Sequence, residues 1–176
     1  MTQHKYHIEF VYTAFNISSN SSNNLCIECY SDAPFGNLPL DGYIIFVSDH
    51  CGNKSSVTWQ SRKVRRVVKS TLATKTLALL DAADAGVFIS CLIKQILGLK
   101  VAPSVKCYVN NKSLVDALHS TTSVEDKSLR INIAVLRDMM QRRDVEDVIW
   151  VKTAHQLANA LTKKGACSED LLRAFY

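Results

Sequence analysis

Three short apolar runs, followed by alternating helical and strand-like segments, organise the chain from residue 25 onward. The first three runs are rich in β-branched and aromatic residues and are separated by short polar links, which predicts an antiparallel meander. Two later runs have the same character. The predicted strands cover residues 25–30, 42–48, 56–61, 105–109 and 148–152.

The longest helical pattern lies between Ser70 and Gly98. Ser70 or Thr71 could cap its first turn, and Gly98 stands where a helix ends. Apolar residues recur in it at helical spacing, at Leu72, Leu79, Leu80, Ala83, Val87, Cys91 and Ile96. Shorter helices are predicted at 112–119, 128–141, 155–163 and 169–175. This order predicts an α/β fold whose five-stranded mixed sheet, a three-strand meander followed by alternating helices and strands, has helices on both faces.

The 176 residues, 47% of them apolar and 21% charged, suffice for one globular domain with a buried core. We assign residues 25–176 to this domain and residues 1–24 to a partly flexible N-terminal extension that ends in a polar Ser/Asn tract. The start of the chain lacks the apolar region of a signal peptide, and no apolar run has the length of a membrane span. We therefore expect a cytoplasmic or nuclear chain that is not secreted and contacts no membrane.

The cysteines and tryptophans are most simply explained by packing. Cys26 and Cys29 have the spacing of a zinc-binding pair, but no second pair follows, and both lie in a strand-like run. We expect the six cysteines to be reduced and mostly buried. Trp59 and Trp150 fall in predicted strands, which favours core positions for both.

The net charge of +5 permits a polyanionic partner without proving one. Five cations fall within residues 62–69, between the third predicted strand and the long helix. They are Arg62, Lys63, Arg65, Arg66 and Lys69. Such a group could neutralise nucleic-acid phosphates regardless of base sequence, although a solvated loop explains it equally well.

Four segments, in a fixed order, carry a resemblance to a known family. The first two are Tyr30-Ser31-Asp32-Ala33, and Trp59-Gln60-Ser61 with the Ser-Thr-Leu-Ala-Thr-Lys-Thr-Leu-Ala-Leu run at 70–79. The others are Asn110-Asn111-Lys112-Ser113-Leu114 and Gln156-Leu157-Ala158-Asn159-Ala160-Leu161-Thr162-Lys163. Each motif alone is weak, but together, over about residues 25–165, they resemble the ribonuclease H domain of copia-type retrotransposon polyproteins.

The resemblance implies a site in which four carboxylates hold two Mg²⁺ ions for cleavage of RNA in an RNA–DNA hybrid. The family's carboxylates fall here on Asp32, Lys75, Asn110 and Asn159, so only the first is retained. We therefore predict that the two-metal site is lost and that the chain holds no metal or other cofactor. We further predict that Lys75 bridges Asp32 in place of a metal ion, the alternative being an Asp32 that faces solvent.

These expectations favour a catalytically inactive ribonuclease H-like module, retained for binding an RNA–DNA hybrid or other nucleic acid, or for a structural role beside other polyprotein domains. One alternative is an active hybrid ribonuclease with rearranged metal ligands, and another is a protein-interaction scaffold. Asp81 and Asp84 lie about two turns beyond Lys75 on the long helix, too far to replace the lost Glu. The sequence leaves the oligomeric state open.

Overall fold

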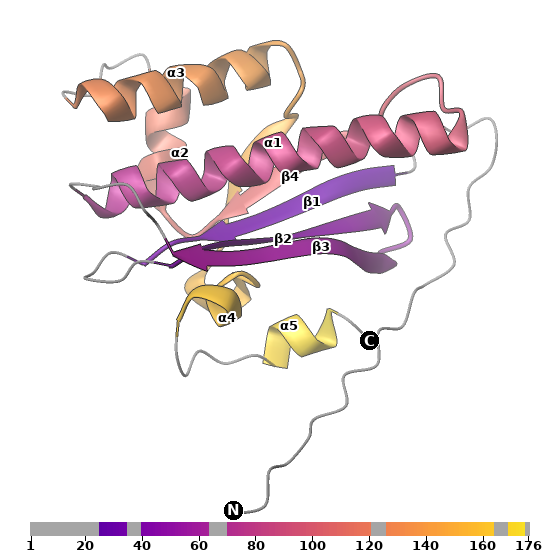
Figure 1. Ribbon diagram of the computed structural model, residues 1–176, viewed down its shortest axis with the longest axis horizontal. Helices are drawn as coiled ribbons and strands as arrows, with labels where there is room; N and C mark the ends of the chain where they lie inside the picture. Colours follow the sequence, from indigo (N-terminus) through magenta and orange to yellow (C-terminus); the bar gives the residue numbers. More distant parts are fainter. Residues whose placement is uncertain (1–24, 35–39, 64–69, 121–125, 164–168, 175–176) are drawn as a thin grey trace, which may run out of the picture.

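Five strands form one mixed sheet at the centre of the structure, which is a computed structural model (Figure 1). The structure describes residues 25–34, 40–63, 70–120, 126–163 and 169–174, and the predicted N-terminal extension lies outside them. The strands are β1 (Leu25–Asp32), β2 (Leu40–Asp49), β3 (Lys54–Lys63), β4 (Ser104–Val109) and β5 (Asp147–Trp150). β1, β2 and β3 pair antiparallel, whereas β4 and β5 run parallel to β1, in the order β3-β2-β1-β4-β5. The predicted meander and mixed sheet are confirmed.

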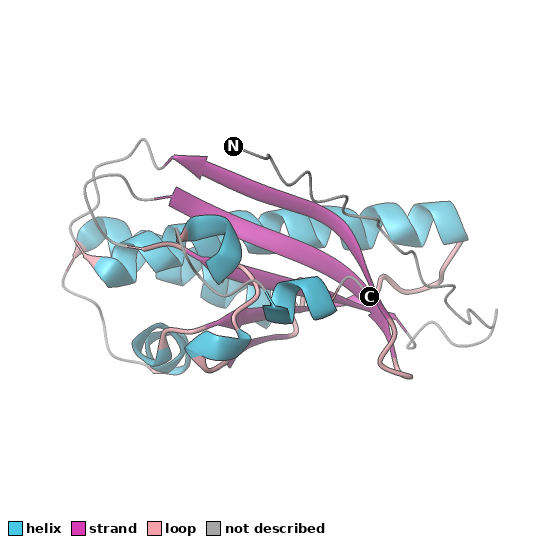
Figure 2. Cartoon of the chain, turned by 90° about the horizontal axis from the view of Figure 1, so that it is seen from below, coloured by secondary structure: helices cyan, strands magenta, loops and turns pink. Residues whose placement is uncertain are grey.

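Helices cover both faces of the sheet, as predicted. They are α1 (Thr71–Leu97), α2 (Lys112–His119), α3 (Lys127–Gln141), α4 (Asn159–Thr162) and α5 (Glu169–Arg173), with a 3₁₀ helix, η1 (Thr153–His155). α1, α2 and α3 lie on one face of the sheet, and α4 and α5 lie on the other (Figure 1). Figure 2 shows the second face, with the two short helices in front of the strands.

Both ends of α1 are set by the residues that the sequence indicated. The side chain of Ser70, rather than Thr71, accepts a hydrogen bond of 3.1 Å from the backbone N–H of Ala73. Gly98 has a φ of 62°, a left-handed conformation that glycine adopts at little cost and that ends the helix.

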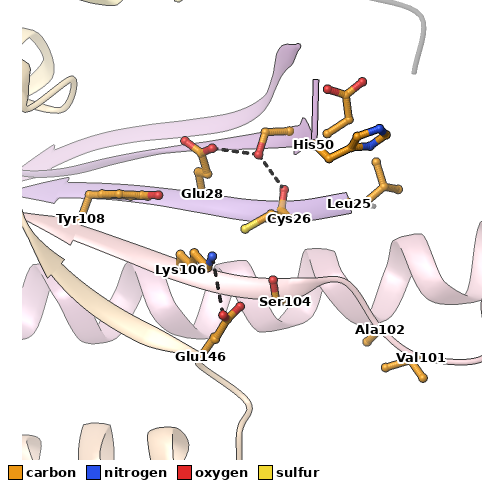
Figure 3. A pocket seen from close by; sticks show the side chains of 12 residues that line it. Leu25, Cys26, Glu28, His50, Val101, Ala102, Ser104, Lys106, Tyr108 and Glu146 are labelled. Atoms are coloured by element: carbon orange, nitrogen blue, oxygen red, sulfur yellow. Dashed lines mark hydrogen bonds and ion pairs between the residues drawn. The ribbon is translucent and has the colours of Figure 1, made fainter. Parts of the chain in front are cut away.

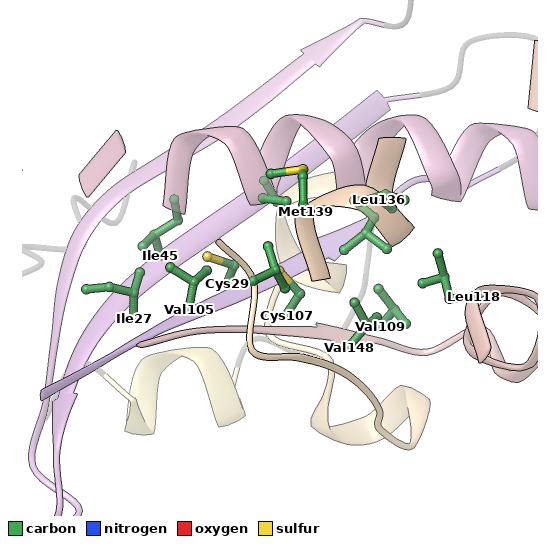
Figure 4. Packing of buried hydrophobic residues seen from close by; sticks show 14 of the residues in the cluster. Ile27, Cys29, Ile45, Val105, Cys107, Val109, Leu118, Leu136, Met139 and Val148 are labelled. Carbon is green, nitrogen blue, oxygen red and sulfur yellow. The ribbon is translucent and has the colours of Figure 1, made fainter. Parts of the chain in front are cut away.

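The main core lies between the sheet and α1, α2 and α3 (Figure 4). Alternate residues of β1 and β4, such as Ile27 and Val105, point toward α1, and the helix meets them with small residues, including Ala82 and Ala83. At Gly86 the approach is so close that a Cβ would collide with Sγ of Cys29 and lie 3.1 Å from Cγ1 of Val105. The small residues of α1 therefore set its distance from the sheet.

Substituting Gly86 by Ala should lower the free energy of unfolding by about 1–3 kcal/mol, because the added methyl group overpacks this contact. Helix propensity alone would give the opposite result, an increase in the free energy of unfolding, since alanine is a better helix former than glycine. Urea denaturation measures the change, and Asp84→Ala at an exposed position of α1 should alter the same free energy by less than about 0.5 kcal/mol. Unchanged stability in the Gly86 variant would contradict the close packing.

The predicted helix at 155–163 is confirmed only at its C-terminal end, as α4, because side-chain hydrogen bonds to the backbone interrupt it before Asn159. The chain forms η1, breaks, and starts α4 only at Asn159. Nε2 of Gln156 donates to the backbone oxygen of Tyr108 at 2.9 Å, and Nδ2 of Asn159 donates to the backbone oxygen of Thr153 at 2.5 Å. Such bonds compete with a continuous helix. Here the Gln156 bond ties the segment to β4, and the Asn159 bond ties the start of α4 to η1.

Both tryptophans are more exposed than predicted. Trp59 is 51% exposed and Trp150 is 45% exposed, because each lies on an edge strand of the sheet. The prediction of core positions is therefore wrong for both.

The described cysteines divide into buried (Cys29 and Cys107), half-buried (Cys26) and exposed (Cys51 and Cys91), so the expectation that most are buried is also too strong.

The C-terminal half of α1 exposes apolar side chains. Phe88 is 66% exposed and Ile96 is 70% exposed, and Cys91 is also exposed, so Cys91 and Ile96 lie outside the core although they fit the apolar periodicity of the helix. By length and composition alone α1 could cross a membrane, which contradicts the expectation that no apolar run is long enough. A long core helix has the same properties, and α1 packs against β1, β2 and β4.

Candidate functional site

The four positions that correspond to the family's carboxylates meet at one end of the sheet. Asp32 ends β1 and Asn110 follows β4, and these two strands are parallel neighbours whose carboxyl ends therefore lie side by side. Lys75 lies in the second turn of α1, and Asn159 is the first residue of α4. Crevices at the carboxyl ends of parallel strands are where open α/β sheets place their ligands.

The ammonium group of Lys75 joins Asp32 to Asn110. Nζ of Lys75 donates to Oδ1 of Asp32 and, at 2.5 Å, to Oδ1 of Asn110. The predicted bridge between Lys75 and Asp32 is thus present in the structure. The side chain of Lys75 is only 13% exposed, so this contact is largely withdrawn from water.

A second ammonium group, which sequence reasoning missed, lies on the other oxygen of the same carboxylate. Nζ of Lys163 is 3.0 Å from Oδ2 of Asp32 and donates to Oδ1 of Asn159 at 2.7 Å. The hydroxyl of Thr162 donates to Oδ2 of Asp32 at 2.9 Å. The available signal was the Thr-Lys pair that closes the fourth motif, because a lysine four residues after Asn159 shares its helix face.

Asp32 is buried and ionised at the centre of this arrangement. It is 1% exposed, so the alternative of a solvent-facing carboxylate is wrong. Burial by itself raises the pKa of Asp32, but Lys75 and Lys163 outweigh it and hold the pKa below the usual value. The formal charge of the three side chains is +1, from one carboxylate and two ammonium groups.

These residues do not fit a pair of Mg²⁺ ions. Mg²⁺ takes oxygen ligands, and two such ions need several negative charges around them. Here one carboxylate is present at the four positions, and each of its oxygens is bonded to an ammonium group. Asn110 and Asn159 offer carbonyl oxygens, but both of these accept hydrogen bonds from the same two lysines.

Cations line the same end of the sheet. Lys63 ends β3, Lys112 follows β4 and Lys152 follows β5, and all three side chains lie at exposed positions. With the partly exposed Lys163 we name these four lysines the basic rim. Four strand spacings separate β3 from β5, so the rim extends over roughly 19 Å across the site.

The structure describes two of the five cations predicted to bind nucleic acid. Arg62 is engaged within the protein, since its Nε is 3.1 Å from Oδ1 of Asp41 and its Nη2 pairs with Asp81. Lys63 is exposed at the end of β3. The remaining three, Arg65, Arg66 and Lys69, lie outside the described residues.

A pocket of about 570 Å³ lies at the opposite end of the sheet from Asp32 (Figure 3). It is lined by the starts of β1 and β4 and the end of β2. Most of its charged side chains are paired within the protein: Glu28 accepts a hydrogen bond of 2.8 Å from Ser48 and pairs with Lys54, and Lys106 lies 3.6 Å from Glu146. Each of these two pairs, Glu28 with Lys54 and Lys106 with Glu146, is formally neutral, whereas the group at Asp32 has a net positive charge.

Solved structures of ribonucleases H share the arrangement of strands and helices, whereas no protein-family model and no curated protein matches the chain. Ribonuclease H1 of the archaeon Halobacterium salinarum is similar with a TM-score of 0.55 and 16% identity, covering 82% of this chain and 96% of that one. LC11-ribonuclease H1, isolated from compost and solved with an RNA/DNA hybrid, has a TM-score of 0.54 and 16% identity, covering 77% and 93%.

A foamy viral protease-reverse transcriptase, also solved with an RNA/DNA hybrid, has a TM-score of 0.53 and 11% identity, with 94% of this chain matching 23% of the viral one. At these identities the likeness concerns the arrangement of the backbone. The five-stranded mixed sheet with helices on both faces therefore has the ribonuclease H-like fold.

Proposed function

We propose that the chain is a catalytically inactive ribonuclease H-like module, derived from a copia-type retrotransposon, that binds nucleic acid without cutting it. The observation that carries this proposal is the double ion pair at Asp32, where Lys75 and Lys163 each bond one carboxylate oxygen. The copia origin rests on the four ordered sequence motifs, which contribute Asp32, Lys75, Asn110 and Asn159 to this end of the sheet.

Loss of cleavage follows from the charges at the site. Two-metal hydrolysis needs two divalent cations close together, one to activate a water and one to stabilise the leaving oxygen. A site that already holds two ammonium groups repels such ions, because like charges at a few ångströms cost several kcal/mol at an intermediate dielectric constant. The asparagines keep the shape of the expected aspartates and remove their charge.

Binding is supported by the basic rim. Its lysines project at the end of the sheet where the site lies, and exposed cations bind the phosphate backbone largely without regard to base sequence. Two of the proteins that share the fold were solved with an RNA/DNA hybrid, which makes a hybrid the first ligand to test.

An active nuclease with rearranged ligands has no support among the described residues. There, no group of three or more His, Cys, Asp or Glu side chains could hold a metal ion. Asp81 pairs with Arg62, and Glu146 and Asp147 lie at the start of β5, away from the carboxyl ends of the strands.

One observation favours the alternative function of a protein-interaction scaffold. The exposed apolar residues Phe88, Leu92 and Ile96 follow one another at intervals of four on α1 and form a ridge along the helix. Such a ridge would suit contact with another protein domain, and salt dependence separates this function from nucleic-acid binding.

The chain should bind a labelled RNA–DNA hybrid and leave it intact in Mg²⁺ or Mn²⁺. If the four rim lysines contact phosphates, the slope of log affinity against log salt concentration should be about −3 to −4. Fluorescence anisotropy measures the affinity, and a denaturing gel measures the integrity of the RNA. The double variant Lys112→Glu/Lys152→Glu should lose at least about tenfold in affinity.

Two results would contradict the proposal. Cleavage by the natural chain would show an active enzyme, and absence of binding at low salt would leave the scaffold function.

A further inference from the structure

The site at Asp32 has become attractive to anions. The four positions Asp32, Lys75, Asn110 and Asn159 sum to a formal charge of zero, where four carboxylates would give −4, and Lys163 brings the local charge to +1. Since Asp32 is 1% exposed and accepts from both lysines and from Thr162, its negative charge faces the protein. An approaching ligand therefore meets ammonium groups before it meets the carboxylate.

The two lysines keep hydrogen-bonding capacity for such a ligand. An ammonium group has three N–H donors. Lys75 uses two of them, on Asp32 and Asn110, and Lys163 uses two, on Asp32 and Asn159. The side chain of Lys163 is 35% exposed and that of Lys75 is 13% exposed, so Lys163 is the donor that solvent and ligands reach first.

The surroundings favour a polyanion over a single small anion. The basic rim extends roughly 19 Å across the end of the sheet, about five or six nucleotide steps at 3.4 Å each. Trp150 ends β5 beside Val109 and is 45% exposed, so its ring is accessible at this end of the sheet. A phosphate held at Lys163 would have rim lysines on both sides of it, Lys63 toward β3 and Lys112 and Lys152 toward β5.

We propose that Lys163, supported by Lys75, holds one backbone phosphate of a bound nucleic acid directly, where the resembled family holds it through metal ions. This inference rests on the proposed function. It adds to the proposed function that the bound group is a backbone phosphate and that binding needs no divalent ion. Lys163 is here a binding residue, Lys75 a positioning residue, and Asp32 the anchor that fixes both.

The test uses hybrids of about six base pairs, the length of the basic rim, so that few binding registers are possible, and a single phosphate is replaced by a neutral methylphosphonate at each position in turn. With the natural chain, one position should lower the affinity about tenfold, the value of a charge-assisted hydrogen bond. With Lys163→Met that penalty should vanish, because the phosphate no longer has its partner. Lys152→Met, which removes a rim lysine with no contact to Asp32, should keep the penalty at that position.

Affinity for the unmodified hybrid should agree within about twofold in EDTA and in Mg²⁺ at equal ionic strength, since no metal bridges the contact. Lys163→Arg keeps the cation and should keep the positional penalty. This variant is the control for the case in which Lys163→Met loses the penalty because it folds poorly. Hybrid binding with the same positional pattern in Lys163→Met and the natural chain would overturn the inference and leave the proposed function standing. Absence of any hybrid binding by the natural chain would overturn both.

Discussion

Changing Lys75 to Glu and both Asn110 and Asn159 to Asp should give a chain that cuts RNA–DNA hybrids. The substitutions restore four carboxylates at positions that the fold already brings together, and the backbone of β1, β4 and the two helices needs no change. Lys163 stays, since it matches the lysine of the family motif. We expect Mg²⁺-dependent cleavage on the order of 10³-fold or more above the background of the natural chain. The measurement is cleavage of a labelled RNA–DNA hybrid.

Adding Asp32→Asn to this triple variant is the matched control. It removes the one carboxylate that the natural chain retains at the four positions and should abolish the cleavage. A triple variant that binds Mg²⁺, keeps its fold and still fails to cut would count against the assignment of these four positions. If the natural chain cuts, the site assignment is wrong and the ligands must be sought elsewhere.

Replacing Lys75 by Met should destabilise the natural chain by about 3 kcal/mol. The substitution leaves the buried carboxylate of Asp32 with one ammonium group in place of two, and breaking a buried pair costs far more than breaking a surface one. Urea denaturation gives the free energy of unfolding. Lys106→Met is the control, since its pair with Glu146 is 3.6 Å long and exposed, and its loss should cost less than about 1 kcal/mol.

The effect of Lys75→Met should also depend on pH, in a direction set by Asp32. The pKa of Asp32 is lower in the folded chain than its usual value of about 3.9, so the ion pairs stabilise the fold fully above that value. The contribution is lost as the pH falls through the folded pKa. The difference in unfolding free energy between the natural chain and Lys75→Met should therefore shrink below about pH 4. A difference that stays constant down to pH 2 would contradict the ion pair.

The sequence predicts the elements of this fold well where the signals are local. Ser70 and Gly98 mark the ends of α1 because a side-chain cap and a left-handed glycine act within one turn of the helix. Burial is less well predicted, because it depends on which faces are covered. Trp59 and Trp150 have the residue type of a core position, but each lies on an edge strand.

The sequence predicts which four residues correspond to the family's carboxylates, but it predicts only one of the two lysine contacts with Asp32. The resemblance places Asp32, Lys75, Asn110 and Asn159 in one group, and a bridge from Lys75 to Asp32 follows from their opposite charges. The contact of Lys163 with Asp32 joins residues 131 positions apart. It depends on the break between η1 and α4, which side-chain hydrogen bonds impose and helical periodicity does not reveal.

The double ion pair at Asp32 also bears on how the chain can evolve. A magnesium ion occupies a site by mass action, whereas an ammonium group carried by the chain is present in every folded molecule. Returning Lys75 alone to Glu would place a second carboxylate beside Asp32 and leave the amides of Asn110 and Asn159 unchanged, so stability would fall before catalysis appeared. Three substitutions must therefore arrive together before four carboxylates stand at this site. Under the proposed function, cleavage is hard to regain by single steps, and selection acts on what the folded surface binds.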